Sequence, residues 1–328
     1  MSDGPLVSVL IPCFNAGRWI DQALGAVRRQ AYRNLEVIVV DDGSADGSAT
    51  VVEWHAAADP RVRSIRQARM GACAARNRAW SEARGAFLHF LDADDLLSPD
   101  KIGQQLEALA AAPQGCVASC AWRPFRGEPG DLPAVQMAVF RNLSPMEWFV
   151  RHLSGGGHIA VGGWLVPRTV AELAGPWNEQ LTSDQDGDWF GRVVAASRGI
   201  VFVDGPLLHY RRVPGSLSAL KTSHDVWSRM HATDTKAKLA ARQFGIDLAS
   251  ETTVADDYNN LLVAGWPLSR PYQRELSERI ALYGGARRKV ELGGRAARML
   301  SQAIGWKLTR RLQRASWRLQ AASPFRAT

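Results

Sequence analysis

The chain has no apolar run of about 18 residues or more, which excludes a membrane-spanning helix at the level of sequence. Cysteine is scarce, with four residues in 328. Cys116 and Cys120 are not at a common zinc spacing, and no histidine cluster accompanies them. We therefore expect four buried thiols. The N-terminal segment 1–5 lacks the basic-then-apolar pattern of a signal peptide, so we expect a cytoplasmic protein.

Positive charge is concentrated at one end of the chain. The formal net charge is +8, yet residues 286–328 hold eleven lysines and arginines and one acid, so this tail carries +10 and the first 285 residues carry −2. The basic residues of the tail are Arg287, Arg288, Lys289, Arg295, Arg298, Lys307, Arg310, Arg311, Arg314, Arg318 and Arg326. With 46% hydrophobic and 22% charged residues, the composition is that of a folded protein with a full core.

Buried apolar runs alternate with helical periodicity along the first part of the chain. The pattern predicts strands at 7–12, 36–40, 62–65, 86–91 and 117–122, with helices at 19–27, 46–58, 72–84 and 99–112. Further along, it predicts helices from 144, over 186–196, over 223–245 and from about 269 onward, and strands at 159–166 and 200–210. The fold class is therefore α/β, with a mostly parallel, Rossmann-like sheet flanked by helices.

Polar side chains follow three of the predicted strands at their carboxyl ends. They are Asn15, Asp41, Asp42, Asp92 and Asp94. In parallel α/β sheets ligands bind beyond the carboxyl ends of the strands. Carboxylates at such a place suit Mg²⁺ or Mn²⁺, which usually hold phosphate oxygens as well. The pattern favours a site for a metal-bound nucleoside diphosphate.

A structural alternative exists for the acidic segment 92–95. It precedes Ser98-Pro99-Asp100, which is a good helix start, so its carboxylates can also be read as an acidic helix N-terminus.

Several segments occur in the order and at the spacing of a known family. They are Val7–Asn15, Glu36–Ser44, Gly71–Asn77, Leu91–Asp95, Ala174–Glu179, Gln185–Arg192 and Tyr210–Arg211. Together they resemble family 2 glycosyltransferases over roughly residues 5–220. The resemblance implies a GT-A fold in residues 1–220, with a donor half at about 1–125 and an acceptor half at about 126–220, followed by a mainly helical extension over 221–328.

The resemblance also implies a set of donor-binding residues. They are Pro12, Phe14, Asn15, Asp41, Asp42, Arg76, Asp92, Tyr210 and Arg211. Asp42 is expected to contact the base or ribose, whereas a structural role weighs equally for Asp41. A surface role is the alternative for Arg76. Tyr210 and Arg211, followed by Gly215-Ser216, resemble a loop that closes over the diphosphate, although Val213 replaces a histidine that is frequent there.

Asp92-Ala-Asp94 matches the Asp-x-Asp motif of the family. On an extended segment the two carboxylates would share one side. Asp94 is the expected direct ligand of Mg²⁺ or Mn²⁺, and Asp92 a metal or ribose contact. Asp95 is expected to cap the following helix. His209 is a candidate further ligand, with a packed strand histidine as the favoured alternative.

The resemblance places the catalytic base at Asp186, one of three acids at a helix start where the dipole favours anions and lowers their pKa. Gln185 stands where the family commonly has glutamate. The resemblance then implies direct displacement with inversion at the anomeric carbon, for which a carboxylate can deprotonate the attacking hydroxyl. Candidates on the acceptor side are Trp164, Trp177 and Asp188, with core packing as the favoured alternative for both tryptophans.

The basic tail has a helical stripe of apolar residues. The stripe consists of Ile304, Leu308, Leu312, Ala315 and Leu319, and Trp306 and Trp317 lie on one side. A basic amphipathic helix with tryptophan suits an anionic membrane surface, which would make the protein peripheral on the inner face of the cell membrane. Packing on the core or on a second subunit in a homo-oligomer is the main alternative, and nucleic acid is the least favoured partner.

The expected function is metal-dependent, inverting transfer of a sugar from a nucleoside-diphosphate sugar, by default a UDP-sugar, to a hydroxyl of a glycan or lipid-linked acceptor in polysaccharide synthesis. A sugar-nucleotide nucleotidyltransferase is one alternative, although segment 12–15 is unlike its Gly-rich, basic phosphate loop. A non-catalytic nucleotide-sugar-binding or scaffold protein on the same fold is the other. It predicts a lost metal acid or base, whereas Asp94 and Asp186 are both present.

Overall fold

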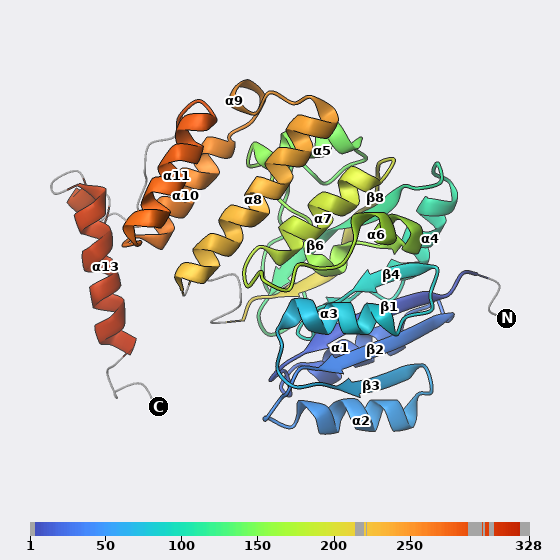
Figure 1. The fold of residues 1–328 in the computed structure, drawn as a ribbon. Helices are drawn as coiled ribbons and strands as arrows, with labels where there is room; N and C mark the ends of the chain where they lie inside the picture. Colours follow the sequence, from blue (N-terminus) through green and yellow to red (C-terminus); the bar gives the residue numbers. More distant parts are fainter. Residues whose placement is uncertain are drawn as a thin grey trace.

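The computed structural model describes residues 4–213, 220, 222–287, 297, 299–301 and 305–321, with the side chains of 206 and 314–321 excepted. An α/β unit forms the larger part of the described chain, and a group of helices follows it (Figure 1). Part of the predicted basic tail and of the loop after Arg211 lies outside the described residues or side chains. These positions are Gly215, Ser216, Arg288, Lys289, Arg295, Arg298, Ile304, Arg314, Ala315, Trp317, Arg318, Leu319 and Arg326.

The main sheet has five strands in the order β3-β2-β1-β4-β7. Their bounds are β1 Val7–Cys13, β2 Leu35–Asp41, β3 Val62–Arg66, β4 Phe87–Phe90 and β7 Val166–Pro167. The first four strands are parallel, and β7 runs antiparallel to β4. The predicted strands at 7–12, 36–40, 62–65 and 86–91 are confirmed, and so is the mostly parallel character of the sheet.

Both faces of this sheet are covered, which explains the continuous apolar strands. Side chains at odd positions of β1, such as Val9 and Ile11, pack in one cluster with α1 (Ile20–Arg28) and α2 (Ser48–Ala58). Leu10, which alternates to the other face, packs with α3 (Ala72–Ser81). Each face therefore has its own core, and the loops at the carboxyl ends remain available for ligands.

A smaller second sheet departs from the predicted single sheet. Its order is β5-β8-β6, with bounds β5 Leu96–Leu97, β6 Val117–Phe125 and β8 Ile200–Arg211. An isolated bridge between Ala118 and Leu165 connects its region to the main sheet.

The strand predicted at 159–166 is wrong. A 3₁₀ turn η1 (Val161–Gly163) lies in its middle, and only its last residue, Val166, belongs to a strand, β7. The backbone approaches its neighbours closely there: a Cβ at Gly162 would lie 2.8 Å from Cδ1 of Leu208, and one at Gly163 would lie 2.8 Å from Ile159. The glycines permit this contact, which a regular strand with side chains would prevent.

Helices complete the fold around the sheets. Their bounds are α4 Lys101–Ala110, α5 Pro145–Leu153, α6 Arg168–Ala174, α7 Gln185–Ala196, α8 Ser223–Phe244, α9 Leu248–Glu251, α10 Val254–Gly265, α11 Arg270–Leu282 and α13 Trp306–Ala321. Ser144 and Glu147 form a reciprocal capping box at the start of α5, as expected for the helix predicted there. The short helix α6 was not predicted. Helices α9 and α10 lie in the extension over 221–328 that was expected to be mainly helical, although no separate helix was predicted at their positions.

Helix α8 packs on α7, and its apolar side chains join the core beneath α3. Asp234 of α8 binds Arg279 of α11 through both carboxylate oxygens and accepts a hydrogen bond from Tyr258 of α10 at 2.7 Å. Figure 1 shows α13 beyond this group, farthest from the main sheet. Its Trp306 meets Trp266 edge to face, with ring centroids 5.5 Å apart.

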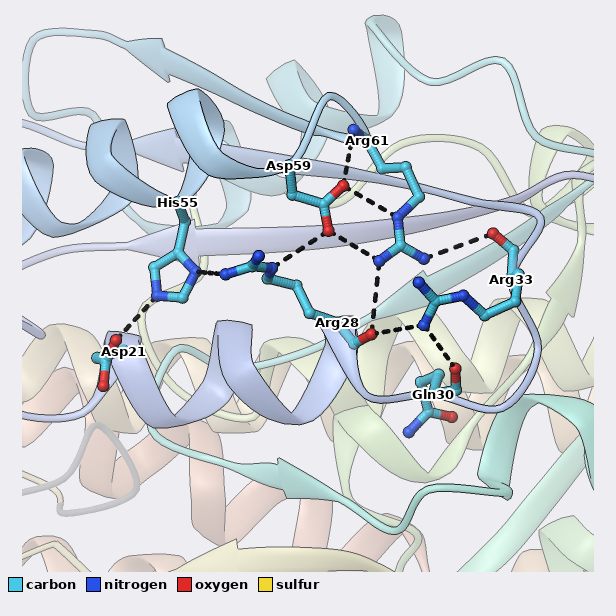
Figure 2. A network of polar contacts seen from close by, with 7 residues as sticks. All are labelled: Asp21, Arg28, Gln30, Arg33, His55, Asp59 and Arg61. Carbon is cyan, nitrogen blue, oxygen red and sulfur yellow. Dashed lines mark hydrogen bonds and ion pairs between the residues drawn. The ribbon is translucent and has the colours of Figure 1, made fainter.

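A polar network holds α1 and α2 together at the edge of the main sheet (Figure 2). Asp59 accepts hydrogen bonds from Arg61 at 2.8 Å and from Arg28 at 3.2 Å. His55 of α2 lies between Arg28 and Asp21 of α1. The Asp59 side chain is 9% exposed, whereas Arg28 is 29% and Arg61 20% exposed, so removing the arginines would leave a largely buried carboxylate without its partners.

In the part of the chain that the structure describes, no helix has the length and apolarity needed to cross a membrane. All four cysteines are buried and free, so the expectation of buried thiols is confirmed.

Candidate active site

A cleft of about 1150 Å³ lies beyond the carboxyl ends of β1, β2 and β4, with α3, α7, α8 and α10 contributing to its walls. Eleven of the fourteen predicted site residues line it. They are Pro12, Phe14, Asn15, Asp42, Arg76, Asp92, Asp94, Trp164, Asp186, Tyr210 and Arg211. Asp41, Trp177 and Asp188 are not among its lining residues.

Asp42 holds the loop that follows β3. Its Oδ1 accepts hydrogen bonds from Gln67 Nε2 and from the Met70 amide, and its Oδ2 accepts one from the Gly71 amide, each at 2.8 Å. A carboxylate has about four acceptor sites, so capacity remains for a ligand hydroxyl or amide. The predicted contact of Asp42 with a base or ribose is compatible with this geometry and stays a prediction.

The β1–α1 loop presents Phe14 and Asn15 to the same part of the cleft. Asn15 has a left-handed backbone with φ 47°, which asparagine tolerates better than most residues. Its Oδ1 accepts a hydrogen bond from the Ala45 amide at 2.9 Å, which ties this loop to the one after β2. The guanidinium of Arg69 lies 3.8 Å from the centre of the Phe14 ring, so a flat cationic surface forms beside Asp42.

The surroundings of Asp41 fit a structural role rather than a contact with the donor. It is the last residue of β2 and its side chain is 2% exposed. Its Oδ2 lies 3.8 Å from Arg66 Nε on the neighbouring strand. Because side chains alternate along a strand, the carboxylate of Asp41 points away from the face that Asp42 presents to the cleft.

Arg76 is buried, so the surface alternative for it is wrong. It donates to Asp92 Oδ1 at 2.8 Å and to Gln185 Oε1 at 2.9 Å, and its guanidinium lies 4.6 Å from the centre of the Trp177 ring. Arg76 therefore joins the acidic strand end on one side of the cleft to the start of α7 on the other. Its contacts position these two elements.

The segment from Asp92 to Asp95 forms a turn, with the Asp95 amide donating to the Asp92 carbonyl at 3.1 Å, and is not extended as expected. Arg211 of β8 holds this turn. Its Nε donates to the Asp94 carbonyl at 2.7 Å, and its own backbone amide donates to Asp95 Oδ1 at 2.8 Å. Both Asp92 and Asp94 still line the cleft, because the turn places them on its rim.

The prediction that Asp95 caps the next helix is wrong. Its side chain is 1% exposed and faces β8. Burial and the neighbouring Asp94 raise the pKa of Asp95 well above the ordinary carboxyl value. Helix α4 begins after Asp100 instead, and no side-chain hydrogen bond caps it.

The chemistry of the Asp92–Asp94 pair fits a divalent cation. Burial and the adjacent Asp92 raise the pKa of Asp94 to about 6, and the nearby Arg211 offsets this only in part. Within the described residues there is no cluster of three or more His, Cys, Asp or Glu side chains able to hold a metal. Two carboxylates suit Mg²⁺ or Mn²⁺ that is held jointly with phosphate oxygens and water.

His209 does not join them. It does not line the cleft, its Nε2 lies 3.3 Å from Ser98 Oγ, and its ring meets Phe125 edge to face. It is packed as a strand histidine.

Asp186 lies in the first turn of α7 and lines the cleft. Burial, followed by the proximity of Asp184, raises the pKa of Asp186 above the ordinary carboxyl value. The expectation of a pKa lowered by the helix dipole is therefore wrong, because desolvation outweighs the dipole at this residue. A carboxylate with a raised pKa is a better proton acceptor than an ordinary one.

Asp188 forms an ion pair, and the two tryptophans pack against other aromatic rings in the core. Asp188 is 3% exposed and binds Arg192 one helical turn later at 2.9 Å. Trp177 stacks on Trp189, with ring centroids 4.6 Å apart, and is 1% exposed. Trp164 lines the cleft but is also 1% exposed and stacks on Phe190. Asp188 and Trp177 are therefore not acceptor-side surfaces, because ion pairing and core packing occupy them.

Several cleft residues were not predicted. Lys236 of α8 is 5% exposed and donates to Asp184 Oδ2 at 3.0 Å and to His152 Nε2 at 3.2 Å. Burial and the adjacent Lys236 lower the pKa of His152 to about 3, so its ring is neutral and accepts this hydrogen bond. No sequence motif marks Lys236, because only the packing of α8 on α7 brings it to the cleft.

The chain is similar in sequence to known glycosyltransferases. Residues 8–164 match the family model of glycosyl transferase family 2. The uncharacterized glycosyltransferase EpsJ of Bacillus subtilis (strain 168) is 35% identical over 220 residues, which cover 66% of this chain and 64% of that protein. EpsH of the same organism is 31% identical over 212 residues, 63% of this chain and 61% of its own. The chain thus spans less than two thirds of the length of these relatives.

Solved structures are similar over nearly the whole chain. S. aureus TarS 1-349 in complex with UDP-GlcNAc has a TM-score of 0.60 at 16% identity, covering 95% of this chain and 91% of that one. The mannosyltransferase PcManGT from Pyrobaculum calidifontis, in complex with GDP-Man and Mn²⁺, has a TM-score of 0.51, also at 16% identity, covering 94% and 86%. The fold is that of the GT-A class. Residues 8–164, just under half of the chain, thus match a glycosyl transferase family 2 domain, and the curated relatives that resemble the chain are glycosyltransferases.

Proposed function

We propose that this protein transfers a sugar from a nucleoside-diphosphate sugar to a hydroxyl of a glycan or lipid-linked acceptor, in the synthesis of a polysaccharide. One observation carries the proposal: Asp92 and Asp94 at the end of β4 line the same cleft as Asp186 at the start of α7. These carboxylates supply the two halves that such a reaction needs, a site for the diphosphate and a proton acceptor for the incoming hydroxyl. The family assignment of residues 8–164 supports the same reaction.

The donor end of the cleft is suited to a nucleotide. Phe14, beneath the guanidinium of Arg69, offers a flat surface to a base, and Asp42 offers acceptor capacity to a base or ribose. The related TarS structure contains UDP-GlcNAc and the PcManGT structure contains GDP-Man, so a nucleotide sugar is the ligand class we infer. Uridine is the base to test first.

Asp94, with Asp92, would hold Mg²⁺ or Mn²⁺. Such an ion would neutralise charge on the diphosphate as it leaves. Arg211 keeps the turn bearing both carboxylates in place, since it binds the Asp94 carbonyl and the Asp95 carboxylate. Arg76 keeps the carboxylate of Asp92 facing the start of α7. The two arginines therefore set the geometry of the donor site from opposite sides.

Asp186 would accept the proton of the attacking hydroxyl. Its raised pKa keeps it basic enough to take a proton as the bond to the anomeric carbon forms. A single displacement inverts the configuration at that carbon, because the acceptor attacks from the side opposite to the leaving diphosphate. No side chain is required to form a covalent sugar intermediate.

The test is a panel of nucleotide sugars, assayed for transfer or hydrolysis with Mg²⁺, with Mn²⁺ and with EDTA. The proposal expects turnover of at least one donor, loss of turnover in EDTA, and a product of inverted anomeric configuration by proton NMR. A retained configuration excludes the displacement described above. Turnover that persists unchanged in EDTA excludes the metal.

We also propose that the C-terminal helices bind an anionic membrane surface, where a lipid-linked acceptor would be found. On α13, Leu308 is 47% and Leu312 49% exposed, and Lys307 and Arg311 lie on the same helix. Trp306 differs from the expectation of a membrane-facing tryptophan, since it packs on Trp266. The exposed leucines beside cations are the arrangement that an anionic interface accommodates.

A further inference from the structure

A second cavity, of about 520 Å³, adjoins the cleft and has a strongly basic wall. Its lining consists of Arg18, Trp19, Arg126, Arg211, Arg212 and Val213. Trp19, Arg211 and Val213 also line the cleft, so the two spaces share a wall. We refer to this cavity as the arginine pocket. Its volume lies within the range of roughly 300–1000 Å³ that small-ligand sites occupy.

Three segments that are distant in sequence converge on the arginine pocket. Arg18 precedes α1, Arg126 follows β6, and Arg211 and Arg212 come at the end of β8. Two of the cations lie over Trp19: the guanidinium of Arg18 is 4.4 Å and that of Arg211 4.3 Å from a ring centre of this side chain. Aromatic stacking of this kind restricts the orientation of a guanidinium and leaves its N–H edges available.

The positive charge of the pocket is only partly offset within the described chain: Asp94, Asp95 and Glu128 act electrostatically on Arg211, and Asp131 accepts a hydrogen bond from the Arg126 amide. Among the described residues, none of Arg18, Arg126, Arg211 and Arg212 forms an ion pair with a carboxylate side chain. Arg211 instead uses Nε on the Asp94 carbonyl and Nη2 on Gln22 Oε1. Among the residues that the structure describes, no acidic side chain lines the pocket, although Glu128 and Asp131 lie in the loop after β6.

Four like charges around one cavity repel one another, and an anion that enters it relieves the repulsion. Guanidinium groups match the geometry of phosphate oxygens and bind them through two parallel hydrogen bonds. The shared wall at Arg211, whose backbone and side chain hold the turn bearing Asp94, places such an anion next to the acidic end of the cleft.

From these observations we infer that the arginine pocket is a phosphate-binding site, which takes a phosphate or diphosphate group through Arg18, Arg126 and Arg212. Two sources carry this chemistry: the diphosphate of the donor nucleotide and a phosphate on a separate ligand, such as the acceptor. The inference does not depend on sugar transfer, because the binding can be measured directly without turnover.

The experiment uses the full chain and inorganic pyrophosphate as the probe, with isothermal titration calorimetry in EDTA so that no divalent cation bridges pyrophosphate to Asp94. The pocket variant is Arg18→Gln/Arg212→Gln. The matched control is Arg29→Gln/Arg141→Gln, which removes the same charge from two exposed arginines outside both cavities. We expect the pocket variant to lose at least about tenfold in affinity and the control less than about twofold.

Equal affinities in the wild type and the pocket variant overturn the inference, and so does an equal loss in the control. If the pocket variant unfolds at a lower temperature than the wild type, the titration is repeated with Arg126→Gln, which lies in a different segment. We expect the same loss of pyrophosphate affinity in that variant. Repeating the titration in saturating UDP separates the two sources. Loss of pyrophosphate binding in UDP assigns the pocket to the donor diphosphate, whereas retained binding assigns it to a phosphate on another ligand; each result supports the site.

Discussion

Arg76 offers the sharpest test of how the two sides of the cleft are coupled. Its guanidinium donates to Asp92 at 2.8 Å and to Gln185 at 2.9 Å and lies 4.6 Å from the Trp177 ring centre. A charge-assisted hydrogen bond contributes about 1.5–3 kcal/mol and a desolvated cation–π contact about 1–2 kcal/mol. Glutamine can still donate one of the two hydrogen bonds, so the loss of the other together with the ring contact should lower the free energy of unfolding by about 3 kcal/mol.

A double-mutant cycle isolates the ion pair itself. Breaking a fully buried pair costs about 3–5 kcal/mol, but the Asp92 side chain is 30% exposed and partly solvated. We expect a coupling free energy of about 1.5–2 kcal/mol between Arg76→Gln and Asp92→Asn, measured by urea unfolding. The comparison pair is Arg78–Glu82, whose side chains are 53% and 30% exposed, and its coupling should be about 0.3–0.5 kcal/mol.

The reasoning is refuted if the Arg76–Asp92 coupling is no larger than that of the exposed pair. Such a result would mean that solvent screens the contact and that it does not position the acidic turn. Arg76→Lys gives a second reading: an ammonium keeps the charge but cannot reproduce both hydrogen bonds and the stacking. It should recover less than half of the lost stability.

Three further predictions concern other parts of the chain. The pKa of Asp59 is depressed in the folded state, chiefly by hydrogen bonds from Arg61. The ionised Asp59 carboxylate therefore stabilises the folded protein above the unfolded carboxyl pKa of about 4, and this stabilisation is lost as the pH falls below that value. Asp59→Asn should thus be less stable than the wild type at pH 7, with the difference shrinking toward pH 2 in urea unfolding. Leu308→Glu/Leu312→Glu should abolish flotation of the full chain with anionic liposomes. Asp42→Asn should weaken UDP binding at least about tenfold by calorimetry, because an amide N–H₂ cannot accept from the loop amides that Asp42 binds.

Each of these has a control of the same chemistry. Asp100→Asn removes an exposed carboxylate that forms no ion pair with the described residues and should not alter the pH dependence of stability. Leu173→Glu changes a leucine that is 76% exposed on α6 and should leave flotation intact. Asp204→Asn, on the exposed part of β8, should leave UDP affinity unchanged. A control that behaves like its partner variant contradicts the corresponding prediction.

The first four strands were predictable because a parallel sheet covered on both faces requires uninterrupted apolar runs. The residues at their carboxyl ends follow from the same rule, and Asp42, Asp92 and Asp94 do line one cleft. The segment 159–166 misled prediction because its apolar residues resemble a strand, while Gly162 and Gly163 allow a close backbone contact that only tertiary packing reveals.

The errors within the site have the same origin. Asp95 resembled a helix cap, but its carboxylate accepts a hydrogen bond from the backbone amide of Arg211, which lies 116 residues later in the chain. Asp188 resembled a site acid, but Arg192 neutralises it on the same helix. Lys236 carries no motif and reaches the cleft only through the packing of α8 on α7. Partners so distant in sequence are determined by the tertiary fold, which local patterns do not encode.

The central claim is that the cleft has a donor half at Asp94 and an acceptor half at Asp186. Its most direct test is the rate of metal-dependent sugar transfer as a function of donor concentration in Asp94→Asn and Asp186→Asn. The account predicts a higher KM for donor and a weaker response to metal in Asp94→Asn. In Asp186→Asn it predicts a kcat lowered about 10²–10⁴-fold with donor binding retained. Wild-type kinetics in either variant would contradict the division of roles between the two carboxylates.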